Sequence, residues 1–239
     1  MQKKHLLIFD FDQTIIDVDS EFSMVEKLCP DLFEERIKGD LYLKYKWIDL
    51  NNYIYTRLKQ NGYNYKNVKE YLTSLKLSPN FKELFEYIKK NKNKFETLIL
   101  SANNTHVINL ILTSHNIRDC IDHICCNEGV IDEDNILKII PTNEKYEHCE
   151  DDKPFLCKSL FFEDFIKNKQ TGFDKVFYVA DGGNDFCLSK KLGINDIIFP
   201  RKNYSLYKIL YDKNGKNEVK AKIVSWENGN DICKEIMKY

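Results

Sequence analysis

The chain has 239 residues and a formal net charge of −1, with 36 Lys and Arg residues against 37 Asp and Glu residues. This length fits one large domain or a core with an inserted smaller unit. The balance of charge gives no reason to expect nucleic acid or an anionic membrane surface as a partner. No apolar stretch approaches the roughly 20 residues of a membrane span, and no secretion signal follows Met1, so we expect a cytoplasmic protein with reduced thiols.

The first half of the chain predicts a strand followed by helices. Residues 5–10 are a short apolar run that ends in an acid, which is typical of a buried parallel strand. Between residues 17 and 75, apolar side chains recur at helical spacing and no strand pattern stands out, which predicts a mostly helical insertion. A helix over 80–91 follows, and Ser78 or Asn80 is its expected cap.

The second half alternates between strand and helix patterns. Strands are predicted at 97–101, 122–126, 175–180, 196–199 and 221–225, and helices over the segment around 107–112 and at 156–168. Residues 127–152 are polar and predicted to form a loop, with a small hairpin at 129–140. The alternation predicts an α/β fold with a doubly wound parallel sheet. We divide the chain into a core, 1–16 and 76–239, and a helical insertion, 17–75.

Acidic and hydroxyl side chains stand where three of these strands end. Asp10 and Asp12 follow the first strand, Ser101 ends the second, and Asp181 and Asp185 follow the fourth. Sheets of this kind bind ligands at the carboxyl ends of their strands. Chance would scatter these residues along the chain, so we expect one site at this edge of the sheet.

The four carboxylates predict a metal ion. Crowded carboxylates repel one another unless a cation neutralises them. Mg2+ takes one or two carboxylates and fills its other positions with water and substrate phosphate. The acidic cluster therefore predicts Mg2+, and Mg2+ predicts a small phosphorylated substrate as the partner.

The same residues can carry out phosphoryl transfer. Asp10 can attack phosphorus and form an aspartyl-phosphate, and Asp12 can protonate the leaving oxygen and then activate water. Ser101 is expected at the start of a helix, where its hydroxyl and N–H group would hold phosphate. A lysine, either Lys153 or Lys158, must complete the set of phosphate ligands. Each signal alone is typical of a turn, a cap or a surface lysine; their combined order favours a catalytic site.

The combined motifs resemble a known superfamily. Residues 10–14, Ser101, Lys158 and 181–185 are similar to the four-motif signature of the haloacid dehalogenase superfamily. Within it, the chain resembles the phosphoethanolamine/phosphocholine phosphatase family, which includes pyridoxal phosphate phosphatase-like members. Further matching segments are 83–88, 156–158, 200–204 and 224–226.

The resemblance implies a Rossmann-like core and assigns roles to the first-strand and cap residues. Asp10 would be the nucleophile and a Mg2+ ligand, and Asp12 the general acid/base that also binds Mg2+ through its carbonyl. The insertion 17–75 would be a cap that closes over the site and selects the leaving group. Within it, Asp19 and Glu21 are the candidate specificity residues.

The resemblance also assigns the later motifs. Ser101, Ala102 and Lys158 would hold the phosphate. Asp181 would bind the metal directly, and Asp185 would bind it or orient a metal-bound water.

The leaving group is the least defined part of the prediction. The family serine is usually followed by an aspartate, and here Ala102 takes that position. Asp19, Glu21 and cap aromatics such as Trp47 could still bind a cationic head group. The alternatives to phosphoethanolamine and phosphocholine are pyridoxal phosphate, thiamine monophosphate and pyrophosphate.

Two other functions fit the residues less well than a phosphatase. A dehalogenase needs neither Asp12 nor a metal, and a non-catalytic binding module has no need of Asp12, so both are disfavoured. His106 lies near Ser101 and could touch substrate. The eight cysteines include no Cys-x-x-Cys pair. We interpret Cys149 and Cys157, near His148, as thiols that pack rather than as a metal cluster.

Overall fold

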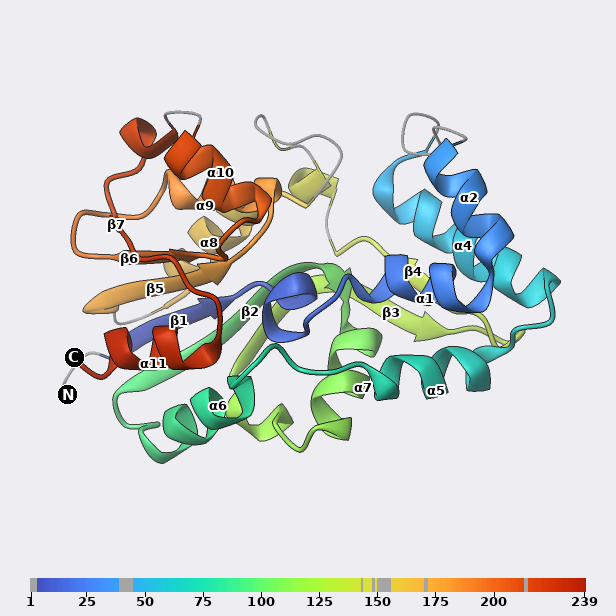
Figure 1. The fold of residues 1–239 in the computed structure, drawn as a ribbon, viewed down its shortest axis with the longest axis horizontal. Helices are drawn as coiled ribbons and strands as arrows, with labels where there is room; N and C mark the ends of the chain where they lie inside the picture. Colours follow the sequence, from blue (N-terminus) through green and yellow to red (C-terminus); the bar gives the residue numbers. More distant parts are fainter. Residues whose placement is uncertain are drawn as a thin grey trace.

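A seven-stranded sheet forms the centre of the computed structural model, which describes residues 4–38, 45–142, 144–147, 149, 156–169, 172–212 and 215–239. Within these residues the strand order is β4-β3-β2-β1-β5-β6-β7, and every neighbouring pair except β3–β4 is parallel (Figure 1). The strands are β1 (His5–Phe9), β2 (Phe95–Asn104), β3 (His123–Ile131), β4 (Leu137–Ile140), β5 (Lys175–Ala180), β6 (Ile197–Pro200) and β7 (Lys222–Ile223). The predicted fold class is confirmed.

Helices cover both faces of the sheet (Figure 1). One face carries α6 (Phe81–Lys90), α7 (Thr105–Ser114) and α11 (Gly229–Ile236), and the other carries α8 (Lys158–Lys167), α9 (Phe186–Ser189) and α10 (Ser205–Asp212). Alternate residues of β1 enter the two cores: Leu7 and Phe9 pack with α6, and Leu6 and Ile8 pack on the α8 side. This double burial explains the unbroken apolar run at the start of the chain.

The chain between β1 and α6 is helical wherever the structure describes it beyond residue 19, apart from short connections. It contains α1 (Ser20–Leu28), α2 (Pro30–Lys38), α4 (Trp47–Gln60) and α5 (Tyr65–Ser74). These helices gather at the β3–β4 end of the molecule (Figure 1). The Asn52 side chain ties α4 to the sheet, because it donates to the Ile139 carbonyl (2.9 Å) and accepts from the Ile139 N–H group (2.7 Å).

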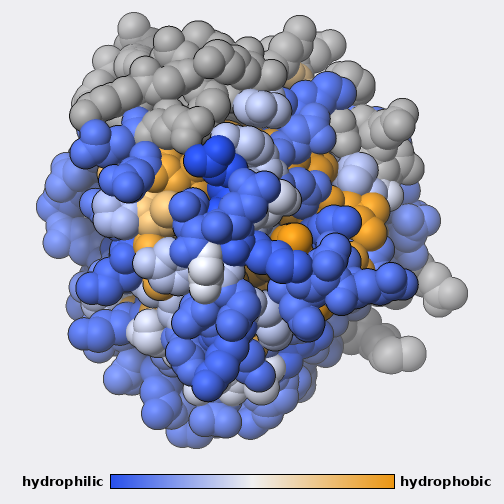
Figure 2. All heavy atoms as spheres, turned by 90° about the vertical axis from the view of Figure 1, so that its right-hand side faces the viewer, coloured by the Kyte–Doolittle hydropathy of each residue, from blue (hydrophilic) through white to orange (hydrophobic). Residues whose placement is uncertain are grey.

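The surface at this end is mostly hydrophilic. Among its described residues, apolar side chains show only between polar ones (Figure 2). No described helix combines the length and the apolar character that a bilayer crossing requires.

The small hairpin predicted at 129–140 is confirmed, because β3 continues to Ile131 and pairs antiparallel with β4. The end of the preceding strand at residue 126 and the side-chain cap of α6 were predicted wrongly. Neither Ser78 nor Asn80 caps α6 with its side chain. Asn80 occupies the N-cap position with a left-handed φ of 60° and makes no side-chain cap bond. The first turn of α11 packs there instead, where a Cβ atom on Gly229 would come 2.3 Å from the Asn80 carbonyl oxygen.

Candidate active site

A tight turn after β1 places two carboxylates at the edge of the sheet. The Asp10 N–H group still donates to the Val179 carbonyl of β5 (2.9 Å), so the chain leaves the sheet at this residue. Gln13 then adopts a left-handed φ of 54°. Arg201, at the end of β6, donates to the Gln13 carbonyl oxygen (2.6 Å). The neighbouring strands therefore fix the turn that carries Asp10 and Asp12.

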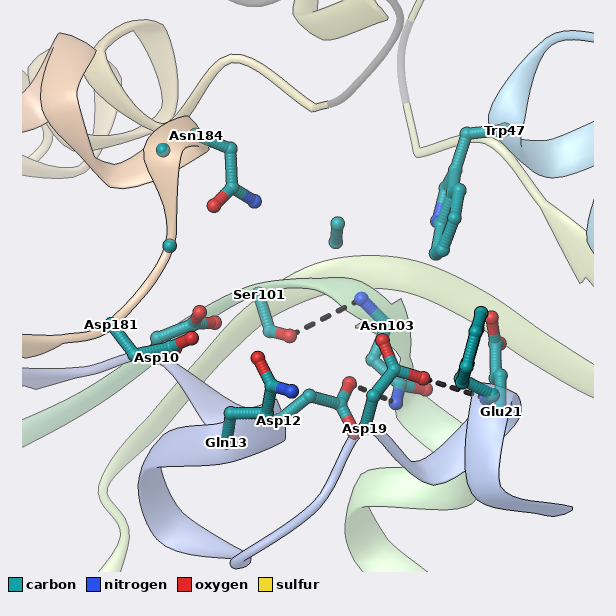
Figure 3. Close-up of a pocket in the computed structure, with 14 residues that line it drawn as sticks. Asp10, Asp12, Gln13, Asp19, Glu21, Trp47, Ser101, Asn103, Asp181 and Asn184 are labelled. Atoms are coloured by element: carbon teal, nitrogen blue, oxygen red, sulfur yellow. Dashed lines mark hydrogen bonds between the residues drawn. The ribbon is translucent and has the colours of Figure 1, made fainter. Parts of the chain in front are cut away.

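The turn opens onto a cavity of about 420 Å³ (Figure 3). Seven of the residues that the family resemblance placed in the site line this cavity: Asp10, Asp12, Asp19, Glu21, Ser101, Ala102 and Asp181. They come from β1, α1, β2 and β5 or the turns that follow these elements. The structure thus brings together side chains from distant parts of the sequence at the edge where parallel strands present their carboxyl ends.

Lys158, the first residue of α8, is buried beneath the cavity between two carboxylates. Its Nζ atom lies 2.9 Å from Oδ1 of Asp10 and 2.5 Å from Oδ1 of Asp185. The Tyr178 hydroxyl donates to the same Asp185 oxygen, and the Gly182 N–H group donates to its Oδ2 atom (2.8 Å). Burial alone would lower the Lys158 pKa, but the two carboxylates raise it above its ordinary value. Lys158 is therefore a protonated ammonium group, and the two carboxylates stabilise its charge in this buried position.

Three carboxylates at this position could hold a metal ion. Oxygen atoms of Asp10, Asp181 and Asp185 lie within 4.8 Å of one another. Both oxygens of Asp185 already accept hydrogen bonds. Among the described residues, Asp10 and Asp181 each keep one carboxylate oxygen without a donor, since the Thr14 hydroxyl bonds only Oδ1 of Asp181 (3.0 Å). Two available carboxylates match the donor set that Mg2+ takes from proteins.

Without a bound cation, the negative charges of Asp10 and Asp181 are unfavourable in this buried site. Burial raises the pKa of Asp10 to about 6 against the opposing charge of Lys158. Burial, and then the charge of Asp10, raises the pKa of Asp181 well above its ordinary value. The residues present therefore suit a divalent cation, which would relieve repulsion between these carboxylates.

Asp12 lies on the side of the cavity that faces the inserted helices. Its Oδ1 atom accepts from the Ser20 N–H group (2.8 Å), and its Oδ2 atom accepts from Nδ2 of Asn103 (2.8 Å) (Figure 3). Burial, and then the nearby charge of Asp19, raises the Asp12 pKa to about 7. A carboxyl group with this pKa exists in both protonation states near neutral pH, as acid–base catalysis requires.

The predicted location of Ser101 at a helix start was wrong. β2 continues past Ser101 with an irregular register as far as Asn104, and α7 begins only after it. The Asn104 side chain caps α7 by accepting from the Val107 N–H group (3.0 Å). The Ser101 hydroxyl instead accepts from the Asn103 N–H group (3.2 Å) at the cavity wall. A helix dipole therefore does not act at Ser101.

The sequence assigned no role to several site residues, although three of them lie within the quoted motifs at 10–14 and 181–185. They are Gln13 and Asn184, which line the cavity, Asn103, which holds Asp12, Thr14, which holds Asp181, and Tyr178, which holds Asp185. Asn103 had one local signal, its position two residues after Ser101. His106 is not among the residues that line this cavity, and its Nε2 atom lies 2.6 Å from the Tyr65 hydroxyl of α5. Lys153, the alternative lysine, lies outside the described residues.

Comparison with known proteins identifies relatives along almost the whole chain. Residues 5–239 match the model of a family described as Putative Phosphatase. A pyridoxal phosphate phosphatase PHOSPHO2 from Bos taurus is 32% identical over 234 residues, covering 96% of this chain and 95% of that protein. A phosphoethanolamine/phosphocholine phosphatase from Gallus gallus is 26% identical, and the match covers 98% of this chain and 88% of that protein. An inorganic pyrophosphatase 2 from Arabidopsis thaliana is 29% identical, and the match covers 98% of this chain and 82% of that protein.

Solved structures share the fold. A substrate-bound phosphoserine phosphatase complex superposes with a TM-score of 0.63 at 16% identity, covering 100% of this chain and 99% of that one. At this identity the likeness concerns the fold alone. The relatives in sequence confirm the predicted family resemblance, and the solved structures confirm the fold.

Because the buried carboxylates of Asp181 and Asp10 repel each other, we expect Asp181→Asn to change the stability of the protein. Because the folded-state pKa of Asp181 is raised, the unfolding free energy of the metal-free protein falls as pH rises through that pKa. Asparagine removes this loss and keeps an oxygen to accept from Thr14. In thermal unfolding with EDTA at about pH 8, the variant should melt at a higher temperature than the unaltered protein.

Added Mg2+ should reverse that order, because only the unaltered protein can be stabilised by the ion. Equal melting temperatures in EDTA, or an undiminished Mg2+ effect in the variant, would contradict the assignment of Asp181 to the metal site.

Proposed function

We propose a reaction for this site from the premise that the chain belongs to the Putative Phosphatase family and is a phosphatase of the haloacid dehalogenase superfamily. The reaction is Mg2+-dependent hydrolysis of a small phosphomonoester through an aspartyl-phosphate on Asp10. One observation supports this proposal best. Asp10 has one oxygen paired with the buried Lys158 ammonium and its other oxygen open beside Asp181.

In the first step, one oxygen of the Asp10 carboxylate attacks phosphorus while the other oxygen stays available to the metal ion, and the bond from phosphorus to the leaving oxygen breaks. Lys158 keeps Asp10 ionised and oriented, and its charge offsets part of the phosphoryl charge. Asp185 and Tyr178 fix the lysine head group. Mg2+, held by Asp10 and Asp181, would add a second positive charge that aligns the phosphoryl group.

Asp12 handles the proton in both steps. In its protonated form it gives a proton to the leaving oxygen. As a carboxylate it then takes a proton from the water that attacks the aspartyl-phosphate, which releases phosphate and restores Asp10. Asn103 and the Ser20 N–H group orient Asp12 for this role. The hydroxyl of Ser101, at the cavity wall, is the proposed donor to a phosphoryl oxygen.

We assign residues 17–75 as the cap that selects the leaving group over a core of 1–16 and 76–239. The α1 helix brings Asp19 and Glu21 to the cavity, and the start of α4 brings Trp47. The Asp19 side chain also forms the N-cap of α1 by accepting from the Phe22 N–H group (2.7 Å). The same carboxylate therefore lines the cavity and stabilises the start of the helix. Closure of the cap would exclude water from the attacking oxygen.

The wall facing the cap favours a planar leaving group. Ala102 adds a methyl group to the cavity lining where an aspartate would attract a quaternary ammonium, and the Trp47 ring lines the same cavity from the start of α4 (Figure 3). A flat apolar face can stack on an aromatic ring. We therefore propose an aromatic phosphomonoester of the pyridoxal phosphate class over phosphocholine. The greater identity to a protein named for pyridoxal phosphate supports the same choice.

The nucleophile can be tested with Asp10→Asn. This variant should lose Mg2+-dependent phosphate release from p-nitrophenyl phosphate by at least about 10³-fold, because the attacking oxygen becomes an amide group. The exposed Asp174→Asn is the control and should keep full activity. Rapid acid quenching of the unaltered enzyme, followed by peptide mass measurement, should find one phosphoryl group on the peptide that contains Asp10.

Retained activity in Asp10→Asn would rule out this nucleophile. A phosphoryl group found on a different peptide would also show that Asp10 is not the nucleophile. If neither protein hydrolyses any member of a phosphorylated-metabolite panel, the site is a binding module.

The leaving-group proposal can be tested with Ala102→Asp. A panel of pyridoxal phosphate, thiamine monophosphate, phosphoethanolamine, phosphocholine and pyrophosphate should show the highest kcat/KM for an aromatic ester in the unaltered enzyme. The new carboxylate should raise the phosphocholine to pyridoxal phosphate ratio of kcat/KM by about tenfold, as one added charge contact can. Ala102→Ser, a small uncharged change, is the matched control.

An unchanged ratio in Ala102→Asp would show that residue 102 does not face the leaving group. A preference for pyrophosphate or phosphocholine in the unaltered enzyme would overturn the aromatic assignment while leaving the Asp10 chemistry untouched.

A further inference from the structure

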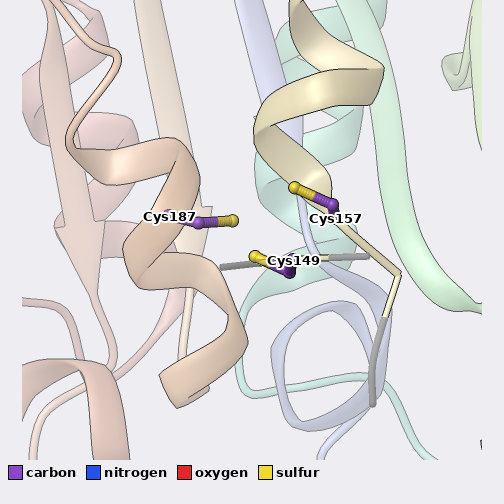
Figure 4. A group of neighbouring side chains, drawn as sticks. All are labelled: Cys149, Cys157 and Cys187. Carbon is purple, nitrogen blue, oxygen red and sulfur yellow. The ribbon is translucent and has the colours of Figure 1, made fainter. Parts of the chain in front are cut away.

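Three cysteines converge at a second position in the core domain (Figure 4). Cys149 follows a short 3-10 helix (Glu144–Glu147), Cys157 immediately precedes α8, and Cys187 lies in α9. Their sulfur atoms point into one space between the two helices and lie within 4.8 Å of one another. All three side chains are buried, with exposures of 2%, 3% and 2%. All eight cysteines are described, and none forms a disulfide.

Ordinary packing does not account well for this arrangement. A buried thiol usually behaves as a small apolar side chain within a larger core. These three form a cluster of their own, apart from the two cores on the faces of the sheet, and Leu160 is the one apolar side chain of the described residues that packs against it. The apolar contacts of these three thiols, which come from three separate segments, are therefore mainly with one another.

Polar and charged groups surround the cluster. The Cys157 sulfur lies 3.2 Å from the Ser159 hydroxyl, and the Cys187 thiol donates to the Asn184 carbonyl (3.5 Å). Lys191 stands close enough to Cys157 and Cys187 that both thiols add to the rise in its pKa, although its hydrogen bond to Glu163 is the larger cause. A cation beside the cluster would offset the single negative charge of three thiolates around a divalent ion.

We propose that Cys149, Cys157 and Cys187 bind one Zn2+ ion as thiolates. Binding forms three zinc–sulfur bonds and releases the three thiol protons to solvent. With zinc–sulfur bonds of about 2.3 Å and tetrahedral angles, the sulfurs would be about 3.8 Å apart, inside the 4.8 Å limit of the cluster. A water molecule would take the fourth position of the ion. The chemistry differs from that of the carboxylate site, because thiolates select a softer metal than Mg2+.

The ion would join the segments that carry the buried ion pair. Cys157 directly precedes Lys158, and Cys187 lies two residues after Asp185. Zinc would bind the start of α8 to α9 and to the segment of Cys149. Its role is structural, so it is independent of whether the proposed reaction takes place.

The sequence did not indicate this site because its third member is distant. We considered Cys149 and Cys157 with His148, which lies outside the described residues, and found no motif spacing. Cys187 joins the other two only because α8 and α9 lie side by side on the same face of the sheet.

Metal content is the direct test. Protein purified without chelator should contain one equivalent of zinc by elemental mass spectrometry. Cys149→Ser should lose it, whereas Cys120→Ser, an equally buried thiol outside the cluster, should keep it. Asp181→Asn should also keep it, which would show that the ion is not in the carboxylate site.

Two measurements on the unaltered chain do not depend on how the variants fold. Replacement of zinc by Co2+ should produce a sulfur-to-cobalt charge-transfer band, because thiolate ligands give such bands. With Mg2+ in excess, a zinc-selective chelator should lower the Tm and expose the three thiols to alkylation. Absence of zinc and of the cobalt band overturns the proposal, as does zinc retained at full stoichiometry in Cys149→Ser. A disulfide among the three cysteines in a non-reduced peptide map also overturns it.

Discussion

The ion pair at Lys158 is the constraint on which the site depends. An ammonium ion with no exposed surface is tolerated only when charge and hydrogen bonds compensate its lost hydration. The compensating groups come from different elements: Asp10 follows β1, and Asp185 follows β5. Their convergence requires β1 and β5 to be adjacent and α8 to begin at Lys158. Loss of one partner would leave a buried charge uncompensated, which costs about 3–5 kcal/mol in other proteins.

The carboxylates at the carboxyl edge of the sheet form two groups with different chemistry, one beside this ion pair and one farther from it. Beside Lys158, Asp10 and Asp181 each keep an oxygen that faces the cavity. The pKa values of both carboxyl groups are raised, so a bound cation would stabilise their ionised forms. Toward the inserted helices, Asp12 has its oxygens bonded by Ser20 and Asn103 and titrates near neutral pH. One carboxylate suited to attack and another suited to proton transfer are thereby separated by their surroundings, although a single residue lies between them in the chain.

The parts of this molecule that were predictable follow from local pattern. The apolar run of β1, the acids after β1 and β5 and the α/β alternation indicated the sheet and the edge where Asp10 and Asp181 lie. Ser101 shows the limit of such patterns, because an irregular register in β2 delays the helix by several residues. Asn103 and Cys187 were missed because their roles arise from contacts between distant segments, which no spacing rule encodes. Asn80, one of the two expected caps of α6, occupies the N-cap position, but with a left-handed backbone and no side-chain cap bond.

The central claim is that the buried Lys158 charge enables attack by Asp10. Its most direct test is kcat for Mg2+-dependent phosphate release by Lys158→Met, a change of similar length without the charge, with thermal unfolding measured on the same samples. The account predicts a loss of about 10²–10³-fold in the folded variant, the usual effect of removing one transition-state donor, while Lys153→Met stays close to the unaltered enzyme. Near-normal turnover in folded Lys158→Met, or a larger loss in Lys153→Met, would contradict it.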